Sequence, residues 1–289
     1  MRQPITSSAG AYLLCALLLA VADLLLDESG NCWRSAMADI CDFISRMAKD
    51  IRPLSSFDME LIRFFQLNDV LGSVSRAEKP FGPDFSAGTL RTSQASTDDA
   101  KASSRTPFTE DYHQALSIMW QWSVLQQSIF LWIRDASCHG EERLSRKQNI
   151  QGVELVDKAL CLQLTILRVL LPSPFSSDST CRVLDPYYRW ILLGMSQLLQ
   201  SAAFRRLECD LPIMPLDCLH HQALAALNDV EEMTTHSVLD AAFFLPLFDA
   251  VGVAVEAEED RKRILRFLGN VEACGFGVAK EYRQVISTR

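Results

Sequence analysis

Apolar residues recur at steps of three and four along most of this chain, which is the spacing of one face of an α-helix. The stretch 33–51 is typical, with apolar residues at Trp33, Met37, Ile40, Cys41, Ile44, Met47, Ala48 and Ile51. No stretch alternates convincingly between apolar and polar residues with the two-residue period of a strand. The 289 residues include only 12 Gly and 11 Pro, few for a loop-rich β protein. The sequence therefore predicts an all-α fold.

The helical segments follow one another closely enough to predict a multi-helix bundle of antiparallel helical hairpins in a single domain, 1–289. Helices are expected at 11–26, 32–51, 57–72, 110–136, 153–171, 184–208, 215–234, 237–254, 258–274 and 276–287. Ser56 is expected to cap the third helix and Gly72 to end it. Pro215 suits a first helical turn, and Gly275 a left-handed helix end. The stretch 137–152 is interpreted as an exposed loop.

One segment departs from this pattern. Residues 75–108 are rich in Ser, Thr, Ala, Asp and Pro, and they show no periodicity and few large apolar side chains. Such a segment buries too little surface to offset the entropy of ordering it. We expect a disordered insertion that divides the first helices from the rest without separating two domains.

Charge and cysteine content limit the classes of function. The net charge of −8 repels phosphate backbones and argues against direct nucleic-acid binding. The basic run 261–263 follows the acidic run 256–260, so the two signs are expected to cancel locally on a solvated helix face. The nine cysteines are an odd number without a CxxC pair, which predicts free, packed thiols in a reducing compartment. They are Cys15, Cys32, Cys41, Cys138, Cys161, Cys181, Cys209, Cys218 and Cys274.

The apolar run 11–26 admits two interpretations. A helix buried on most sides is favoured, because Asp23 interrupts the run and no small-residue cleavage pattern follows it. A signal peptide at 1–26 stays open, with Arg2 as its charged start. The run is too short and interrupted for a confident membrane span, and no membrane partner is expected.

No catalytic constellation is recognisable. The chain contains no GxSxG, GxxxxGK[ST], GxGxxG or HExxH motif, and we predict no enzyme activity, no catalytic residue and no cofactor. Cys218 with His220 and His221 is the nearest metal candidate, but a second half of the ligand set is missing, so no metal site is predicted. The aromatic residues Trp120, Trp122, Trp132, Trp190, Tyr187 and Tyr188 are expected to fill the core, with a ligand cavity between helices as the lesser alternative.

Residues 244–289 carry a family resemblance. The segment contains Phe244, Pro246, Leu247, Phe248, Ala250 and Gly252, then Arg261, Arg263, Ile264 and Leu268, then Gly275 and Gly277 before a last amphipathic helix. This order resembles the end of the fungal-specific transcription factor domain, which follows a binuclear zinc-cluster DNA-binding module. The leucine-rich run and Trp-Arg pair in 12–44 are similar to the opening of that domain. Pro246 is expected to kink its helix, and Gly252 to permit close helix packing.

The resemblance implies a regulatory domain in the nucleus that acts through protein partners, such as a full-length transcription factor. Two features depart from the family. The family often has His and a Gly-Ala pair a few residues after the tryptophan, where this chain has "SAMADI", and the six-cysteine zinc cluster is absent from this sequence. No direct specific DNA binding is therefore expected from this chain alone. The alternative is a helical interaction or scaffold protein without a transcriptional role. A site assembled from scattered polar groups, as an enzyme would need, is the weakest hypothesis.

Overall fold

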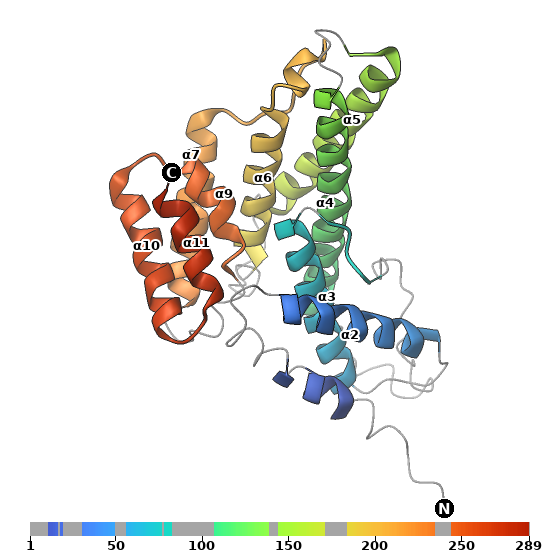
Figure 1. The fold of residues 1–289 in the computed structure, drawn as a ribbon, viewed down its shortest axis with the longest axis vertical. Coiled ribbons are helices and arrows are strands. Elements are labelled where there is room, and N and C mark those ends of the chain that lie inside the picture. The colour runs from blue at the N-terminus through green and yellow to red at the C-terminus, as the bar shows by residue number, and fades with distance from the viewer. Residues whose placement is uncertain are drawn as a thin grey trace, which may run out of the picture.

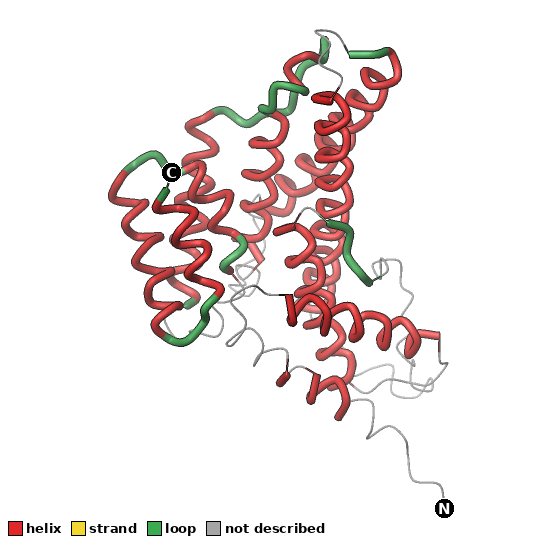
Figure 2. Tube along the Cα trace, viewed as in Figure 1, coloured by secondary structure: helices red, strands yellow, loops and turns green. Residues whose placement is uncertain are grey.

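The computed structural model describes residues 11–16, 18–19, 31–49, 56–76, 78–82, 107–138, 144–170, 184–234 and 244–288. Throughout these ranges the regular structure is helical and no strand occurs (Figure 2), which confirms the all-α prediction. The helices are α2 (Asn31–Lys49), α3 (Ser56–Arg76), α4 (Pro107–Cys138), α5 (Arg146–Leu170), α6 (Asp185–Leu199), the 3-10 turn η3 (Phe204–Arg206), α7 (Leu216–Met233), α9 (Leu247–Ala254), α10 (Glu258–Ala273) and α11 (Val278–Ser287).

Helix α6 occupies the centre of the bundle. It packs against α4 and α5 on one side and against α7 and α9 on the other (Figure 1). Helices α10 and α11 pack on each other and close the side beyond α7 and α9. The sequence of α6 explains its position, because ten of its fifteen residues are buried and only a surrounded helix can be apolar on most faces.

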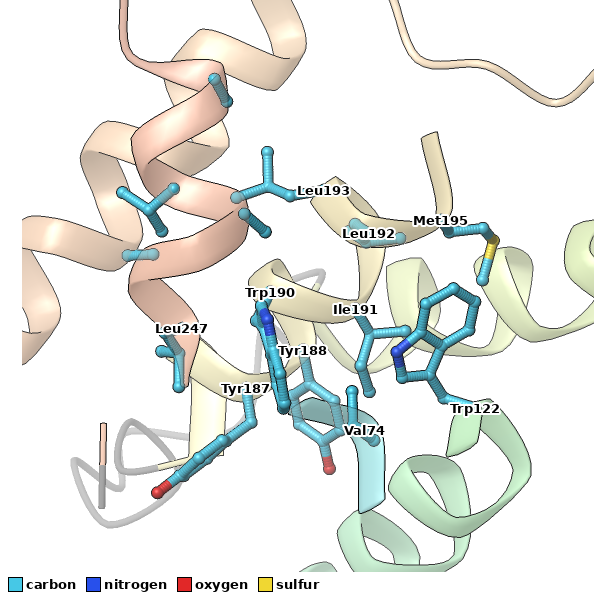
Figure 3. Close-up of a cluster of buried hydrophobic side chains, with 14 of the residues drawn as sticks. Val74, Trp122, Tyr187, Tyr188, Trp190, Ile191, Leu192, Leu193, Met195 and Leu247 are labelled. Carbon is cyan, nitrogen blue, oxygen red and sulfur yellow. The ribbon is translucent and has the colours of Figure 1, made fainter. Parts of the chain in front are cut away.

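The predicted aromatic core residues meet around α6. Trp122 of α4 is 1% exposed and lies beside Ile191 and Met195 of α6 in Figure 3. Tyr187 stacks on Phe244 with ring centroids 5.2 Å apart. Trp132, Trp190, Tyr187 and Tyr188 are all buried, whereas Trp120 is only partly buried. The preferred interpretation of these residues as core, rather than as a ligand site, fits this placement.

A second, much smaller hydrophobic cluster lies at the N-terminal end. Its buried members are Leu13, Met37, Ile40, Cys41, Ile44, Leu61, Ile62 and Phe65. Helix α3 connects the two clusters, because its first half contributes Phe65 here and its second half contributes Val70 and Val74 to the main core. Apolar residues at three- and four-residue steps along α2 form the buried face of this cluster, as the sequence predicts.

The edge of the expected disordered insertion is in fact held against the helices. Helix α3 continues through Gly72 to Arg76, so this glycine does not end it. After the helix, the backbone N–H groups of Phe81 and Gly82 donate to the Asp69 carboxylate at 3.1 and 2.8 Å. The Ser123 hydroxyl of α4 donates to the carbonyl of Glu78 at 2.9 Å. The prediction of disorder is therefore wrong for 75–76 and 78–82, where a buried carboxylate compensates for the scarcity of apolar residues, and for 107–108, which begin α4. Residues 77 and 83–106 lie outside the described ranges.

In the C-terminal part of the chain, Pro246 and Gly275 lie at helix ends rather than inside a helix. Residue 244 is helical, residues 245–246 form a turn, and α9 begins directly after Pro246. The predicted kink within one continuous helix is therefore a break, since proline lacks the N–H that an interior position needs. Gly275 has φ 101° and ends α10, as predicted. Its N–H bonds to Glu272 and that of Phe276 to Val271, which is the Schellman pattern.

The N-terminal apolar run is less buried than predicted. Residues 11–16 and 18–19 are helical, but only Leu13 is fully buried there. Leu18 and Leu19 are 63% and 67% exposed, so the expected helix buried on most sides is not found in these residues. The small N-terminal cluster offers one contact face, which accommodates one side of the run. Across the described part of the chain, no helix combines the length and apolar character that crossing a bilayer requires.

Candidate docking surface on helix α5

The inner face of α5 packs unusually closely. Gly152 leaves so little room that a Cβ there would lie 2.7 Å from Cζ2 of Trp132 and 2.9 Å from both methyl carbons of Leu207. The Trp132 ring also packs on Phe204, with centroids 4.5 Å apart. A glycine is required at this close approach, and it fixes which side of α5 faces the core.

Polar contacts fix the start of the same helix. The Trp132 indole N–H donates to the Gln148 carbonyl at 3.0 Å. The Gln148 side chain donates to Asp135 at 3.0 Å and accepts from the Ser145 N–H at 3.0 Å. Gln148 is itself buried, so these bonds satisfy a polar group that burial would otherwise destabilise. The stretch 137–152 was interpreted as a loop; α5 in fact begins at Arg146, because these side-chain contacts stabilise its polar first turn.

The outer face of α5 carries large apolar side chains that no described element covers. Ile150, Val153, Leu160 and Leu164 are 53%, 47%, 40% and 47% exposed. These four residues and the exposed Asp157 are called the outer stripe. The core face of the same helix is formed by Leu155, Val156, Ala159, Leu162 and Ile166, all buried. Helix α5 thus has two apolar faces, of which the bundle uses one.

The positions of the outer stripe follow a regular spacing. Steps of three, four, three and four residues connect 150, 153, 157, 160 and 164. This is the a/d spacing by which two helices pack along a common seam. Single exposed leucines on a protein surface are ordinary, but four large apolar residues in one a/d line on one helix are the pattern of a docking face.

The described residues do not bring Cys218, His220 and His221 together as metal ligands. Cys218 and His221 are exposed on α7, and His220 is partly buried with no hydrogen-bond partner at its Nδ1 atom. No three His, Cys, Asp or Glu side chains within the described ranges come together as metal ligands do. Cys218 was expected to be packed, but it lies on the outer side of α7 because Leu219 and Ala223 occupy the inner side.

The described cysteines are free thiols, but most are not packed. Cys41 is buried, whereas Cys15, Cys138, Cys161, Cys218 and Cys274 are exposed. The expectation that cysteines act as small core residues is therefore wrong for these five; Cys181 and the side chain of Cys32 lie outside what the structure describes. Burial, followed by the nearby charge of Asp69 and a hydrogen bond to it, raises the pKa of the Cys41 thiol well above its ordinary value.

The charged run before and within α10 is paired as predicted. Lys262 bonds to Glu259 at 3.3 Å, and Arg263 to Asp260 at 3.1 Å. Arg263 also reaches Glu231 of α7 at 2.6 Å, and this hydrogen bond is the main cause of its raised pKa. The run therefore connects two helices and neutralises neighbouring acids, and its cations are engaged within the protein.

The outer stripe was missed at the sequence level for a specific reason. The interpretation of 137–152 as a loop removed Ile150 from the helix, and the prediction of a helix at 153–171 did not distinguish its two faces. Plotting the apolar residues of 146–170 around a helix would reveal the outer stripe, since the inner and outer residues lie on opposite sides of the helix.

Comparisons with known proteins give no relative for this chain: no protein-family pattern, no curated protein and no solved structure matches it.

Proposed function

We propose that this chain is a transcription-regulator-like protein: a helical regulatory domain that acts through protein partners rather than by catalysis or by reading DNA itself. The observation that carries the proposal is the outer stripe of α5, an apolar line on a rigidly held helix. Exposing such side chains to water is unfavourable, and a partner that covers them gains the free energy of their burial.

The transcriptional part of the proposal depends on the resemblance at residues 244–289. The elements of that resemblance correspond to α9, α10, the glycine turn at 275–277 and α11. Gly252, one of its small residues, lies so close to α11 that a Cβ there would be 3.2 Å from Ile286. A nuclear location and a full-length transcription factor as partner follow from the resemblance and belong to the proposal.

The proposal is tested by tethering. Residues 1–289 are fused to an unrelated DNA-binding module, and a reporter carrying its site is measured in cells. We expect reporter output to change relative to the module alone, and the untethered tagged chain to accumulate in the nucleus. The purified chain is expected to give no shifted band with DNA at physiological salt, because its net charge is −8.

Two results contradict the proposal. Tight sequence-selective DNA binding by the purified chain would show that it reads DNA itself. An unchanged reporter together with steady cytoplasmic residence would favour the alternative, a helical scaffold protein without a transcriptional role.

A further inference from the structure

We propose that the outer stripe of α5 binds one amphipathic helix of a partner protein, and that this helix presents Lys or Arg opposite Asp157. The inference deepens the proposed function, on which it rests for the existence of a protein partner, by stating the chemistry that the partner must have. It depends on three observations: the fixed orientation of α5, the spacing of the stripe and the charge at its centre.

The orientation of α5 prevents the stripe from turning inward. Rotation about the helix axis would remove Gly152 from its close contact with Trp132 and Leu207 and bring a larger side chain into that space. It would also break the bond from the Trp132 indole to the Gln148 carbonyl. The four apolar side chains of the stripe therefore stay on the outside while the bundle is folded.

The spacing of the stripe selects a helix as the occupant. From 150 to 164 the stripe rises about 21 Å along the helix axis, close to four turns. An extended peptide would place its side chains on alternating sides, whereas a second helix places its own a and d residues between those of the stripe. Helix α5 packs mainly against α4 and α6, and among the described elements none covers the outer stripe, which leaves room there for such a helix.

The charge of the stripe distinguishes a partner helix from a second copy of this chain. Asp157 occupies the middle position, is exposed and has no hydrogen bond or ion pair within the described residues. Parallel or centred antiparallel self-pairing of α5 would place Asp157 against itself, and shifted antiparallel registers would place it against leucine, valine or isoleucine. Both placements are unfavourable, since the first brings two like charges together and the second buries a charge against apolar side chains. A partner with Lys or Arg at the facing position instead attracts the Asp157 carboxylate.

The test uses synthetic helical peptides as probes. One peptide of about four heptads carries Leu at its a and d positions and Lys at the central a position; a second carries Glu there. Lysines at the e and g positions of both peptides prevent them from pairing with themselves. Binding to the purified 289-residue chain is measured by fluorescence anisotropy, and the folding of each variant is checked by circular dichroism.

The expected result is binding of the Lys peptide at least about tenfold tighter than that of the Glu peptide. Asp157→Lys should reverse this preference. Leu160→Asp and Leu164→Asp should weaken the Lys peptide by about tenfold or more. The matched control is Leu216→Asp on α7, since Leu216 is 61% exposed and lies outside the stripe; this variant should bind as the parent does.

The aspartate variants also exclude simple charge attraction. Each makes an acidic protein more acidic, so a peptide held only by its lysines would bind these variants more tightly, not more weakly. That outcome would overturn the inference, as would the absence of binding by the Lys peptide. Sedimentation of the chain as a dimer that Leu160→Asp dissolves would overturn it as well, because α5 would then bind its own copy.

Failure of the inference and failure of the proposed function give different results. If the tethered chain changes the reporter and Leu160→Asp leaves that change intact, regulation operates through another surface. If the peptides bind as expected but the tethered chain is inert in the nucleus, the docking surface exists and its role is not transcriptional.

Discussion

The main core and the N-terminal cluster follow the same apolar spacing but differ in how they are held together. The main core extends from the second half of α3 to α11 and surrounds α6 on several sides. The N-terminal cluster contains eight buried residues from the chain near residue 13, from α2 and from the first half of α3. The main core is formed by many helices packed around α6, whereas the N-terminal cluster depends on α3, a helix that it shares with the main core.

This difference indicates where polar contacts are needed. In the main core, large side chains such as Trp122 and Phe248 are completely surrounded, and burial alone provides a large favourable free energy. The N-terminal cluster is supplemented by the Asp69 carboxylate, which accepts two backbone N–H groups and contacts the Cys41 thiol. We therefore expect α2 to open before the main core unfolds.

The largest effect is expected from truncating one large side chain in each cluster. Trp122→Ala should lower the free energy of unfolding by roughly 3–5 kcal/mol and shift the denaturation midpoint of the whole bundle. Phe65→Ala removes a side chain that is 0% exposed, but from the smaller cluster. It should reduce hydrogen-exchange protection in α2 with little change in the global midpoint. Equal loss of both readouts in both variants would show that the two clusters unfold as one.

A glycine pair tests the close packing of the main core. Gly152→Ala should destabilise the protein by roughly 2–3 kcal/mol, because the buried Trp132 ring at 2.7 Å cannot move aside freely. The matched control is Gly269→Ala in α10, where a Cβ would meet nothing within 4 Å. That variant should be stabilised by up to about 1 kcal/mol through helix propensity. Thermal unfolding of both variants provides the comparison, and a neutral Gly152→Ala would refute the close contact.

The carboxylate at the N-terminal cluster is tested by Asp69→Ala. We expect a loss of roughly 1.5–2 kcal/mol, since two backbone donors lose a charged acceptor. The loss should appear as faster hydrogen exchange in α2 and in residues 78–82. Asp39→Ala, which removes the same charge from an exposed position on α2, is the control and should change little. Similar exchange in the two variants would mean that Asp69 does not hold this region.

The fold class could be predicted from the sequence because apolar spacing reports helices directly. Met37, Ile40 and Ile44 in α2 and Ile118, Met119 and Trp122 in α4 are buried as their spacing predicts. Helix ends were less predictable where side chains act at a distance. The extension of α3 through Gly72 precedes a segment held by Asp69, and the start of α5 at Arg146 depends on Gln148, Ser145 and Asp135.

The candidate docking surface could be predicted only in part. Its apolar residues are visible in the sequence, but their exposure is not, because a helix with two apolar faces is expected to be buried on both. The exposed side becomes evident only once Gly152 is seen against Trp132 and Leu207. The exposure of Leu18 and Leu19 was mispredicted for the same reason. Their apolar run predicted burial on most sides, but the N-terminal cluster covers only one side of that run.

The smallest expected effect is a pH dependence confined to the N-terminal cluster. The pKa of the Cys41 thiol is raised above its ordinary value of 9.0 by burial and by Asp69. Above pH 9.0 the unfolded thiol loses its proton while the folded thiol keeps it, so stability present at lower pH is lost as pH rises. One pH unit above that value the loss is roughly 1.4 kcal/mol.

Hydrogen exchange of α2, corrected for intrinsic rates, would measure this dependence at increasing pH. Cys41→Ala removes the titrating thiol and should flatten the alkaline dependence, even though the small cavity lowers stability at every pH. Cys218→Ala removes an exposed thiol from α7 and should leave it unchanged. Alkaline opening that persists in Cys41→Ala would assign the effect to another group. Opening that spreads at the same pH to α6 would mean that the two clusters are more tightly coupled than their separate cores suggest.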